Sequence, residues 1–207
     1  MAKLIYFYSA MKGGKSSILI PMAYNLEENN KRVLIVKPTL DTKGDDYILS
    51  RAGAKRKINL WIGQTDSFLS NQNLSLIFET DTILIDEAQF LTEQQVDELW
   101  AISKKLNVQV LGFGLKTNFK GKLFEGSKRF LELADELKEL PIIPLCKCGE
   151  RAIFNARLVN GKYTISGEEC VIEGSQDTIT YEPLCGACFL KNVVLPQKNM
   201  QYLKKLN

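Results

Sequence analysis

A glycine-rich segment near the start of the chain constrains the fold more than any other feature of the sequence. Ser9–Ser16 reads Ser-Ala-Met-Lys-Gly-Gly-Lys-Ser and follows the short apolar run Leu4–Tyr8. Apolar residues at helical spacing come next: Ile18, Leu19, Met22, Ala23 and Leu26. The order strand, loop and helix is the setting in which the pattern G-x-x-x-x-G-K-[ST] binds phosphate. Ser9 stands where that pattern has glycine, and a plain glycine-rich turn before a helix is the alternative interpretation.

The chemistry expected of such a loop follows from its residue types. Glycines let successive backbone N–H groups turn toward a phosphate, and the N-terminus of the following helix adds partial positive charge. In this arrangement Lys15 reaches the β- and γ-phosphates of a nucleoside triphosphate, and the hydroxyl group of Ser16 binds Mg²⁺. The predicted loop consists of Ser9, Ala10, Met11, Lys12, Gly13, Gly14, Lys15 and Ser16.

Further apolar runs, with helical patterns between them, indicate the fold class. The runs are Val33–Val36, Thr82–Ile85 and Val108–Leu111. Runs that are apolar on both faces are typical of central parallel strands. A second helical pattern begins with a capping box at Thr92 and Gln95, and its apolar face consists of Val96, Leu99, Trp100, Ile102 and Leu106. Alternating strands and helices predict an α/β fold with a doubly wound parallel sheet.

The composition of the chain changes near Pro141, which indicates a second unit. Leu140 is followed by Pro141 and Pro144, two cysteine pairs, several glycines and β-type runs such as Tyr163–Ile165. We predict a P-loop α/β domain over residues 1–140, a small zinc-ribbon-like lid domain over residues 141–190, and a polar C-terminal tail over residues 191–207.

Two acidic residues end one of the apolar runs. Asp86 and Glu87 directly follow Ile83-Leu84-Ile85. In P-loop enzymes an aspartate at the end of such a strand orders Mg²⁺ and its waters, and a second acid beside it can accept a proton or position a water. Solvated Asp-Glu pairs are common, so the pattern gains its meaning from the phosphate-binding loop that accompanies it.

Four of the five cysteines form two close pairs. Cys146 and Cys148 make the first pair, and Cys185 and Cys188 make the second. Four thiolates suit tetrahedral zinc, and a closed shell of four makes such a site structural, because no position stays open for catalysis. The alternative is four reduced cysteines without a metal. Cys170 is left over, and we interpret it as a small apolar residue or a loop residue.

The absence of histidine excludes several classes of enzyme. A chain without imidazole cannot perform Ser-His-Asp hydrolysis, Cys-His proteolysis or His-based zinc hydrolysis. A net charge of +3, without a stripe of basic residues interleaved with aromatics, argues against a nucleic-acid partner. The sequence shows no signal-peptide pattern and no apolar run of membrane-spanning length, so we expect a cytoplasmic protein with reduced cysteines and no membrane partner.

Three further segments complete a pattern that involves nearly the whole chain. They are Lys37–Lys43, Gly114–Ser127 and Ala152–Arg157. Together with Ser9–Ser16, the run Asp86–Phe90 and the cysteine pairs, they resemble the thymidine kinases of the zinc-containing type, in the bacterial and phage subgroup. The resemblance extends from Leu4 to about Phe189.

The resemblance implies roles for residues on the phosphate side of a site. Glu87 would be the base that accepts the proton of the nucleoside 5′-hydroxyl group. Besides the glycine-rich loop, the residues along the ATP would be Asp41, Thr42, Lys43, Asp86, Glu87, Ala88 and Gln89. Lys43 stands where the family usually has arginine, so a bidentate contact with phosphate becomes a point-charge contact.

The resemblance also implies a nucleoside site, a regulator and an assembly. Phe119 would stack on the thymine ring, and a lasso-like loop of the zinc unit would close over the base with main-chain hydrogen bonds. The predicted nucleoside-binding residues are Met11, Phe90, Leu115, Phe119, Phe124, Cys170, Val171, Ile172, Glu173, Gly174 and Tyr181. The family commonly forms homotetramers and is inhibited by dTTP.

Residues and resemblance together predict an ATP-dependent thymidine kinase that produces dTMP and ADP, with Mg²⁺ on the ATP and a structural Zn²⁺. A kinase of another nucleoside, such as deoxycytidine, is a closely related alternative. A P-loop ATPase whose zinc unit binds nucleic acid or a protein is the alternative from a different class. The near-neutral charge and the lack of clustered basic residues in the zinc unit argue against that class.

Overall fold

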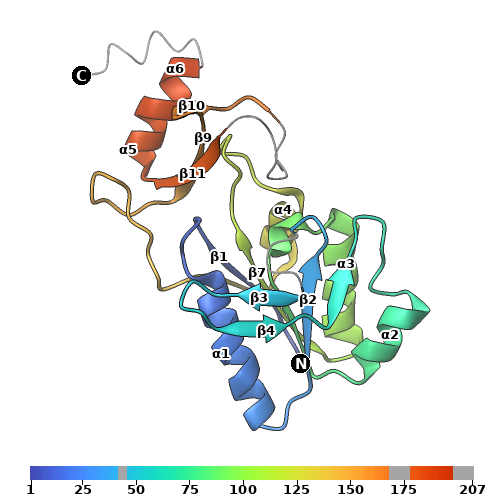
Figure 1. Cartoon of the computed structure of the whole chain (residues 1–207). Helices are drawn as coiled ribbons and strands as arrows, with labels where there is room; N and C mark the ends of the chain where they lie inside the picture. Colours follow the sequence, from blue (N-terminus) through green and yellow to red (C-terminus); the bar gives the residue numbers. More distant parts are fainter. Residues whose placement is uncertain (42–45, 168–177, 198–207) are drawn as a thin grey trace. The chain divides into compact units, whose positions relative to one another are not determined.

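The chain forms two compact units (Figure 1). The computed structural model describes residues 1–41, 46–167 and 178–197. The first unit takes in Met1–Ser9, Gly14–Lys116 and Phe124–Leu140, and the second takes in Ala10–Gly13, Thr117–Leu123 and the chain from Pro141 onward. Two short segments that precede Pro141 in the sequence thus belong to the second unit, which the composition change at Pro141 did not indicate. The boundaries predicted at residues 140 and 190 remain predictions.

A six-stranded parallel sheet forms the centre of the first unit and confirms the predicted α/β class. Its strand order is β5-β2-β6-β7-β1-β8, and all neighbouring pairs run parallel. The strands are β1 (Leu4–Ser9), β2 (Val33–Pro38), β5 (Leu60–Ile62), β6 (Thr82–Ile85), β7 (Gln109–Leu115) and β8 (Glu136–Glu139). The four central strands coincide with the predicted apolar runs, except that Val108 lies one residue before β7. The edge strands β5 and β8 were not predicted, because one is very short and the other is largely polar and exposed.

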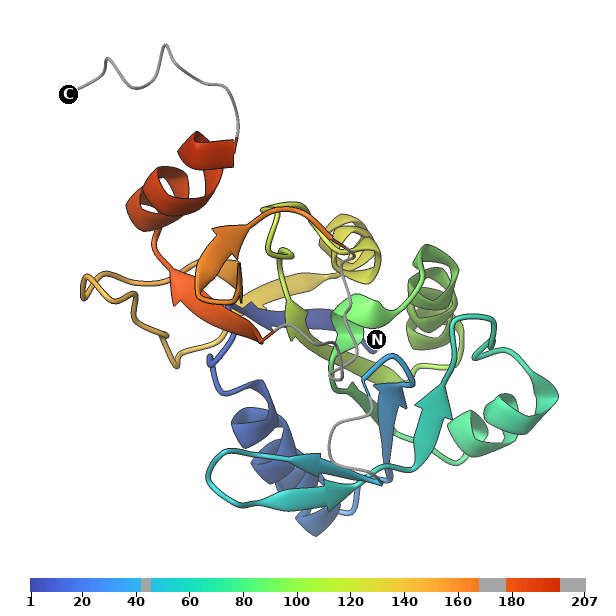
Figure 2. The same ribbon diagram turned by 45° about the horizontal axis from the view of Figure 1, so that its top comes forward.

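Helices cover both faces of this sheet (Figures 1 and 2). The elements on one face are α1 (Lys15–Glu28) and the hairpin of β3 (Tyr47–Leu49) and β4 (Lys55–Lys57), and those on the other are α2 (Asn71–Phe78), α3 (Glu93–Lys105) and α4 (Glu125–Leu133). Side chains alternate between the two faces along each strand. In β2, Leu34 and Val36 join the apolar cluster of α2, α3 and α4, whereas Ile35 joins that of α1. Burial of both faces confirms the doubly wound arrangement.

Helix α3 begins as predicted but buries a narrower face. The N–H of Gln95 donates to Oγ1 of Thr92 at 3.2 Å, and the N–H of Thr92 donates to Oε1 of Gln95 at 3.1 Å. Leu99 is fully buried, but Trp100 is 40% exposed, so the prediction that Trp100 belongs to the apolar face was wrong. One step along a helix turns a side chain by about 100°, which carries Trp100 from the buried stripe to its rim. None of the helices in the described ranges is long and apolar enough to cross a membrane.

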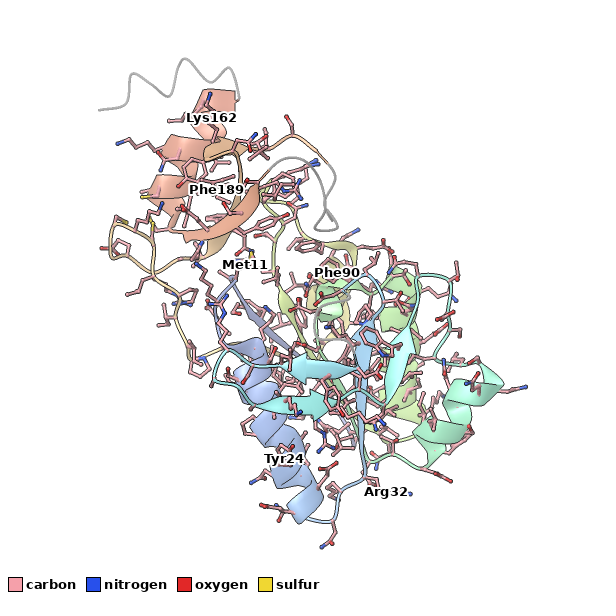
Figure 3. The ribbon with its side chains drawn as sticks, viewed as in Figure 1. Met11, Tyr24, Arg32, Phe90, Lys162 and Phe189 are labelled. Atoms are coloured by element: carbon pink, nitrogen blue, oxygen red, sulfur yellow. The ribbon has the colours of Figure 1, made fainter. Side chains whose placement is uncertain are left out.

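The second unit is built on a three-stranded antiparallel sheet in the order β10-β9-β11. Its elements are β9 (Phe154–Val159), β10 (Lys162–Thr164), β11 (Ile179–Leu184), α5 (Gly186–Phe189), the π-helical turn η2 (Leu190–Val194) and α6 (Leu195–Gln197). Phe189, labelled in Figure 3, stacks on Phe154 with ring centroids 4.5 Å apart. The small apolar cluster around this pair includes Cys146 and Cys185, so the core of the unit and its cysteines are contiguous.

The packing of α4 against the turn η1 (Ala88–Phe90) leads to a first prediction. A β-carbon on Gly126 would lie 2.7 Å from the carbonyl oxygens of Ala88 and Leu91, so the helix contacts this backbone directly. We expect Gly126→Ala to lower the free energy of unfolding by roughly 1–3 kcal/mol, because backbone atoms must move. Urea denaturation measures this effect. The exposed control Lys128→Ala, on the same helix, should change stability by less than about 0.5 kcal/mol. Equal stability of the two variants would contradict the close packing.

Candidate active site

The glycine-rich loop has the geometry of an anion site. β1 ends at Ser9 and α1 begins at Lys15. Gly14 is the N-cap residue of α1; no side chain caps the helix, and its first turn contains no acidic residue. The N-terminal amides and the positive end of the helix dipole are therefore available to a negatively charged ligand. Lys12 has a φ of 68°, an uncommon conformation for a residue with a side chain.

Glu87 is held between a lysine and an amide. Nζ of Lys15 lies 3.9 Å from Oε1 of Glu87, and the lysine is only 9% exposed. Gln89 donates from Nε2 to Oε2 of Glu87 at 2.6 Å, and its own Oε1 accepts from the N–H of Leu115 at 3.1 Å. The backbone of Glu87 is left-handed, with a φ of 50°. Strained backbone of this kind is concentrated at functional sites, and here it directs the carboxylate toward the start of α1.

Asp86 is buried beside Glu87 at the end of β6. It is 4% exposed, and its Oδ1 has no hydrogen-bond partner among the described residues. Burial, followed by the neighbouring carboxylate of Glu87, raises the pKa of Asp86 to about 7; Lys15 and Lys37 act in the opposite direction. A buried carboxylate with an open oxygen is stabilised by a cation. Asp86, together with the hydroxyl group of Ser16 in the same cavity, therefore fits the predicted Mg²⁺.

A cavity of about 250 Å³ gathers these groups, and we call it the carboxylate cavity. It is lined by Ser16, Lys37, Asp41, Leu49, Arg51, Asp86 and Glu87. Nζ of Lys37 lies 3.4 Å from Oδ2 of Asp41. The structure thus brings together four residues predicted from the sequence, and adds Lys37, Leu49 and Arg51, to which the sequence analysis gave no role. Thr42 and Lys43 lie outside the described residues. Ala88 is fully buried in the apolar cluster of the first unit.

Three predicted nucleoside-binding residues lie in the first unit. Phe90, labelled in Figure 3, and Phe124 make an edge-to-face contact with ring centroids 5.7 Å apart and planes at 82°. Leu115 ends β7 and is bonded through its N–H to Gln89, the residue before Phe90. The contact between the two aromatic rings restricts the orientation of each.

Arg157 joins two other predicted residues in the second unit. Its guanidinium carbon lies 3.6 Å from the ring centroid of Phe119, and its Nε donates to Oη of Tyr181 at 2.9 Å. Arg157 and Phe119 are each only 2% exposed. A cation–π contact that is shielded from water contributes about 2 kcal/mol, so Arg157 fixes the orientation of the Phe119 ring. The predicted lasso residues Cys170, Val171, Ile172, Glu173 and Gly174 lie outside the described residues.

Asn155 connects the glycine-rich loop to the segment that carries Phe119. Its Oδ1 accepts from the N–H of Met11 at 2.7 Å, and its Nδ2 donates to the carbonyl of Thr117 at 3.0 Å. The sequence analysis assigned a role to neither Asn155 nor Arg157. The available signal was two polar residues at alternate positions of the otherwise apolar strand β9, which places both on one face.

The four predicted cysteines meet at one point in the second unit. Their Sγ atoms all lie within 4.8 Å of one another, and those of Cys148 and Cys185 are 3.6 Å apart. Tetrahedral zinc with Zn–S bonds of about 2.3 Å places its sulfurs roughly 3.8 Å apart. Burial opposes ionisation of Cys146, but hydrogen bonds from the backbone of Cys148 and Cys185 lower its pKa to about 6. Hydrogen bonding with the thiols of Cys146, Cys148 and Cys185 raises the pKa of Cys188 to about 12. Thiols this close ionise together only around a cation, so the cluster fits zinc.

Fold and site define a P-loop type of α/β nucleotide-binding protein with a four-cysteine cluster. The chain matches the family model of thymidine kinase over residues 2–189. It therefore belongs to the thymidine kinase family, as the resemblance implied.

Individual relatives agree with this assignment. The chain is 38% identical over 182 residues to a thymidine kinase of Legionella pneumophila (strain Paris), covering 86% of each chain. It is 41% identical over 160 residues to the thymidine kinase of Enterobacteria phage T4, covering 77% of this chain and 82% of that one. For the thymidine kinase of Streptococcus gordonii the identity is 38% over 193 residues, covering 92% and 97%. A crystal structure of Bacteroides Pif1 bound to single-stranded DNA aligns over 71% of this chain and 40% of that one, with a TM-score of 0.39 and 16% identity. This similarity is too low to indicate a shared function.

The raised pKa of Asp86 predicts how stability depends on pH. Without Mg²⁺ or nucleotide, the folded chain keeps this proton up to about pH 7, whereas the unfolded chain loses it near about pH 4. The folded state then binds more protons than the unfolded state, so the contribution of Asp86 to stability falls as the pH rises from about 4 to 7. Asn is an uncharged isostere. Asp86→Asn should therefore be more stable than the parent by on the order of 1–4 kcal/mol at pH 8, and by much less at pH 4.5.

Thermal unfolding at several pH values, in buffer without added Mg²⁺ or nucleotide, measures this difference. The control Asp46→Asn alters an exposed carboxylate and should change stability by less than about 0.5 kcal/mol. A stability gain for Asp86→Asn that is the same at every pH would contradict the assigned cause.

The cysteine cluster predicts one zinc ion per chain. Elemental analysis of protein purified without chelators should find one equivalent, and Cys148→Ser should lose most of it, because a hydroxyl group is a poor replacement for a thiolate ligand. Structural zinc contributes on the order of 10 kcal/mol to a small unit, so this variant should also unfold at a lower temperature. Cys170→Ser, outside the two pairs, should keep its zinc. If elemental analysis finds no zinc in the parent protein, the predicted zinc site is refuted.

Proposed function

We propose that this chain transfers the γ-phosphoryl group of ATP to the 5′-hydroxyl group of thymidine and releases dTMP and ADP. The observation that carries the proposal is the convergence of Lys15, Asp86 and Glu87, at the start of α1 and the end of β6, in a chain of the thymidine kinase family. Lysine, helix amides and a cation-binding carboxylate stabilise the charge of a transferring phosphoryl group.

The reaction requires one bond to form and one to break. The 5′-oxygen bonds to the γ-phosphorus while the bond from that phosphorus to the β,γ-bridging oxygen breaks, and ADP leaves with the electron pair. The hydroxyl proton passes to the carboxylate of Glu87. Lys15 and the amides of the loop hold the phosphates in line with the nucleoside. Mg²⁺, held by Ser16 and Asp86, would neutralise part of the charge on the β- and γ-phosphates.

The different surroundings of the two acids support different roles. Asp86 is buried and has an oxygen without a partner, which suits a cation. Glu87 is more accessible, with 21% of its side chain exposed, and Gln89 orients one of its oxygens. A residue that takes a proton from a substrate must be accessible to that substrate. These differences favour Glu87 as the base and Asp86 as the Mg²⁺ ligand.

The remaining assignments follow from the resemblance and are also proposals. Thymine would stack on Phe119, with Met11, Phe90, Leu115, Phe124, Tyr181 and Cys170–Gly174 as further contacts, and Asp41, Thr42, Lys43, Ala88 and Gln89 would lie along the ATP. We place the protein in the cytoplasm as a homotetramer with dTTP as its feedback inhibitor. One dTTP molecule joins a thymine to a triphosphate, so it would engage both recognition elements at once and bind more tightly than thymidine. Competition with dTTP and dCTP tests this, because only dTTP should inhibit strongly.

Glu87→Gln tests the assigned base. The variant should bind ATP and thymidine normally, because the amide has the same shape, but its kcat should fall by roughly 10²- to 10⁴-fold, the usual contribution of a general base. Glu93→Gln, on the exposed start of α3, is the matched control and should retain full activity. A near-normal kcat for Glu87→Gln would remove Glu87 from the role of base.

A panel of nucleosides with labelled ATP tests the function as a whole. Transfer to thymidine, and much less to deoxycytidine, is the expected result. Phosphorylation of deoxycytidine instead would identify the related kinase. ATP hydrolysis that DNA stimulates, without any nucleoside product, would identify the P-loop ATPase.

A further inference from the structure

We propose that Arg51 is a further catalytic residue of this site, whose guanidinium group binds the γ-phosphoryl group of ATP as it is transferred. This inference rests on the proposed kinase function and extends it to a residue of the β3–β4 hairpin. Arg51 lines the carboxylate cavity together with Ser16, Asp86 and Glu87.

The charges around the cavity single out Arg51. Lys37 is 2% exposed and is paired with Asp41 at 3.4 Å, and Lys15 faces Glu87 at 3.9 Å. Arg51, by contrast, is exposed and forms no ion pair within the part of the chain that the structure describes. Both lysines already neutralise carboxylates of the site. Arg51 is therefore the cation lining the cavity whose charge remains available to an incoming anion.

The turn that carries Arg51 has a well-defined backbone. The N–H of Ser50 donates to the carbonyl of Ala54 at 2.8 Å, and the N–H of Ala54 donates to Oγ of Ser50 at 3.0 Å. The N–H of Gly53, at a φ of 88°, closes the turn on the carbonyl of Ser50 at 3.0 Å. These bonds hold the backbone of Arg51 in place while its side chain extends to the cavity. A side chain on a fixed backbone loses less freedom when it binds a ligand.

The hairpin is in turn attached to α1, the helix whose N-terminus follows the glycine-rich loop. Ile48 and Ile58 are 1% and 5% exposed, and both belong to the same apolar cluster as residues of α1. Arg56 forms an ion pair with Glu27 of that helix and lies 5.0 Å from the ring centroid of Tyr24, which is labelled in Figure 3. The anion site at the start of α1 and the arginine on the hairpin are thus positioned by one packed element.

A guanidinium group suits this role chemically. It is planar, permanently charged and weakly hydrated, and it can donate two parallel hydrogen bonds to two phosphoryl oxygens. The transferring group carries charge spread over three oxygens while its bonds rearrange. Arg51 would stabilise that charge without exchanging a proton or forming a bond, and Glu87 remains the proton acceptor.

Separate binding titrations with an ATP analogue and with ADP locate the contact. With Mg²⁺ present and no nucleoside, Arg51→Ala should bind the β,γ-imido analogue of ATP about tenfold or more weakly than the parent, and ADP with unchanged affinity, because only the former carries a γ-phosphate. With thymidine, its kcat should fall by roughly 10²- to 10³-fold, and the KM for thymidine should not change. Arg51→Lys should restore part of both effects, because lysine keeps the charge but loses the bidentate geometry.

Lys55→Ala is the matched control, since it removes an exposed cation from the same hairpin that does not line the cavity. The inference is overturned if Arg51→Ala behaves like this control. It is also overturned if Arg51→Ala weakens the ATP analogue and ADP equally, because the contact would then lie away from the γ-phosphate. If the parent chain phosphorylates no nucleoside, the proposed kinase function fails, but the difference between ATP and ADP binding still tests Arg51.

Discussion

The parallel pairing of the central sheet is the constraint on which the rest of the first unit depends. Strands β1 and β6 both pair with β7, and β2 pairs with β6, all in the same direction. Carboxyl ends of parallel strands meet at one edge of a sheet, and ligands of open α/β folds bind there. This pairing brings together the glycine-rich loop after β1, Asp41 after β2 and the Asp86–Glu87 pair after β6. These residues are far apart in the sequence and come together only because the strands run the same way.

The site concentrates charge where water is scarce, and its chemistry follows from that. Several features of the site each lower the stability of the fold when taken alone. They are a buried aspartate with an oxygen that has no partner, a glutamate on a left-handed backbone, and two buried lysines that face carboxylates. A nucleoside triphosphate with its metal ion, which we propose as the ligand, would relieve several of these costs at once, because it would supply both a cation for Asp86 and an anion for the helix N-terminus.

The second unit has only a small core, yet it fixes the positions of several side chains. Its apolar cluster is limited, and the four thiols add an attachment point for a metal next to Phe154 and Phe189. Two buried polar residues of β9 then hold segments to which we assign a function. Asn155 holds the backbone at Met11 and Thr117, and Arg157 stacks on Phe119. The unit thus supports both a part of the glycine-rich loop and the ring proposed to bind thymine.

Much of this arrangement was readable in the sequence because it is encoded locally. The glycine-rich loop, the four central strands, the capping box at Thr92, the acids after β6 and the cysteine pairs each depend on residues that are neighbours along the chain. Local patterns did not reveal that Ala10–Gly13 and Thr117–Leu123 belong to the second unit, or that Trp100 lies on the rim of its helix. They also did not reveal that Arg51 lines the carboxylate cavity, or that Asn155 and Arg157 have partners in the second unit. The types of group in the sequence determined which chemistry was possible. The tertiary structure decided which of them meet, because burial, hydrogen bonding and charge pairing depend on distances between residues remote in the chain, and no periodicity or motif contains those distances.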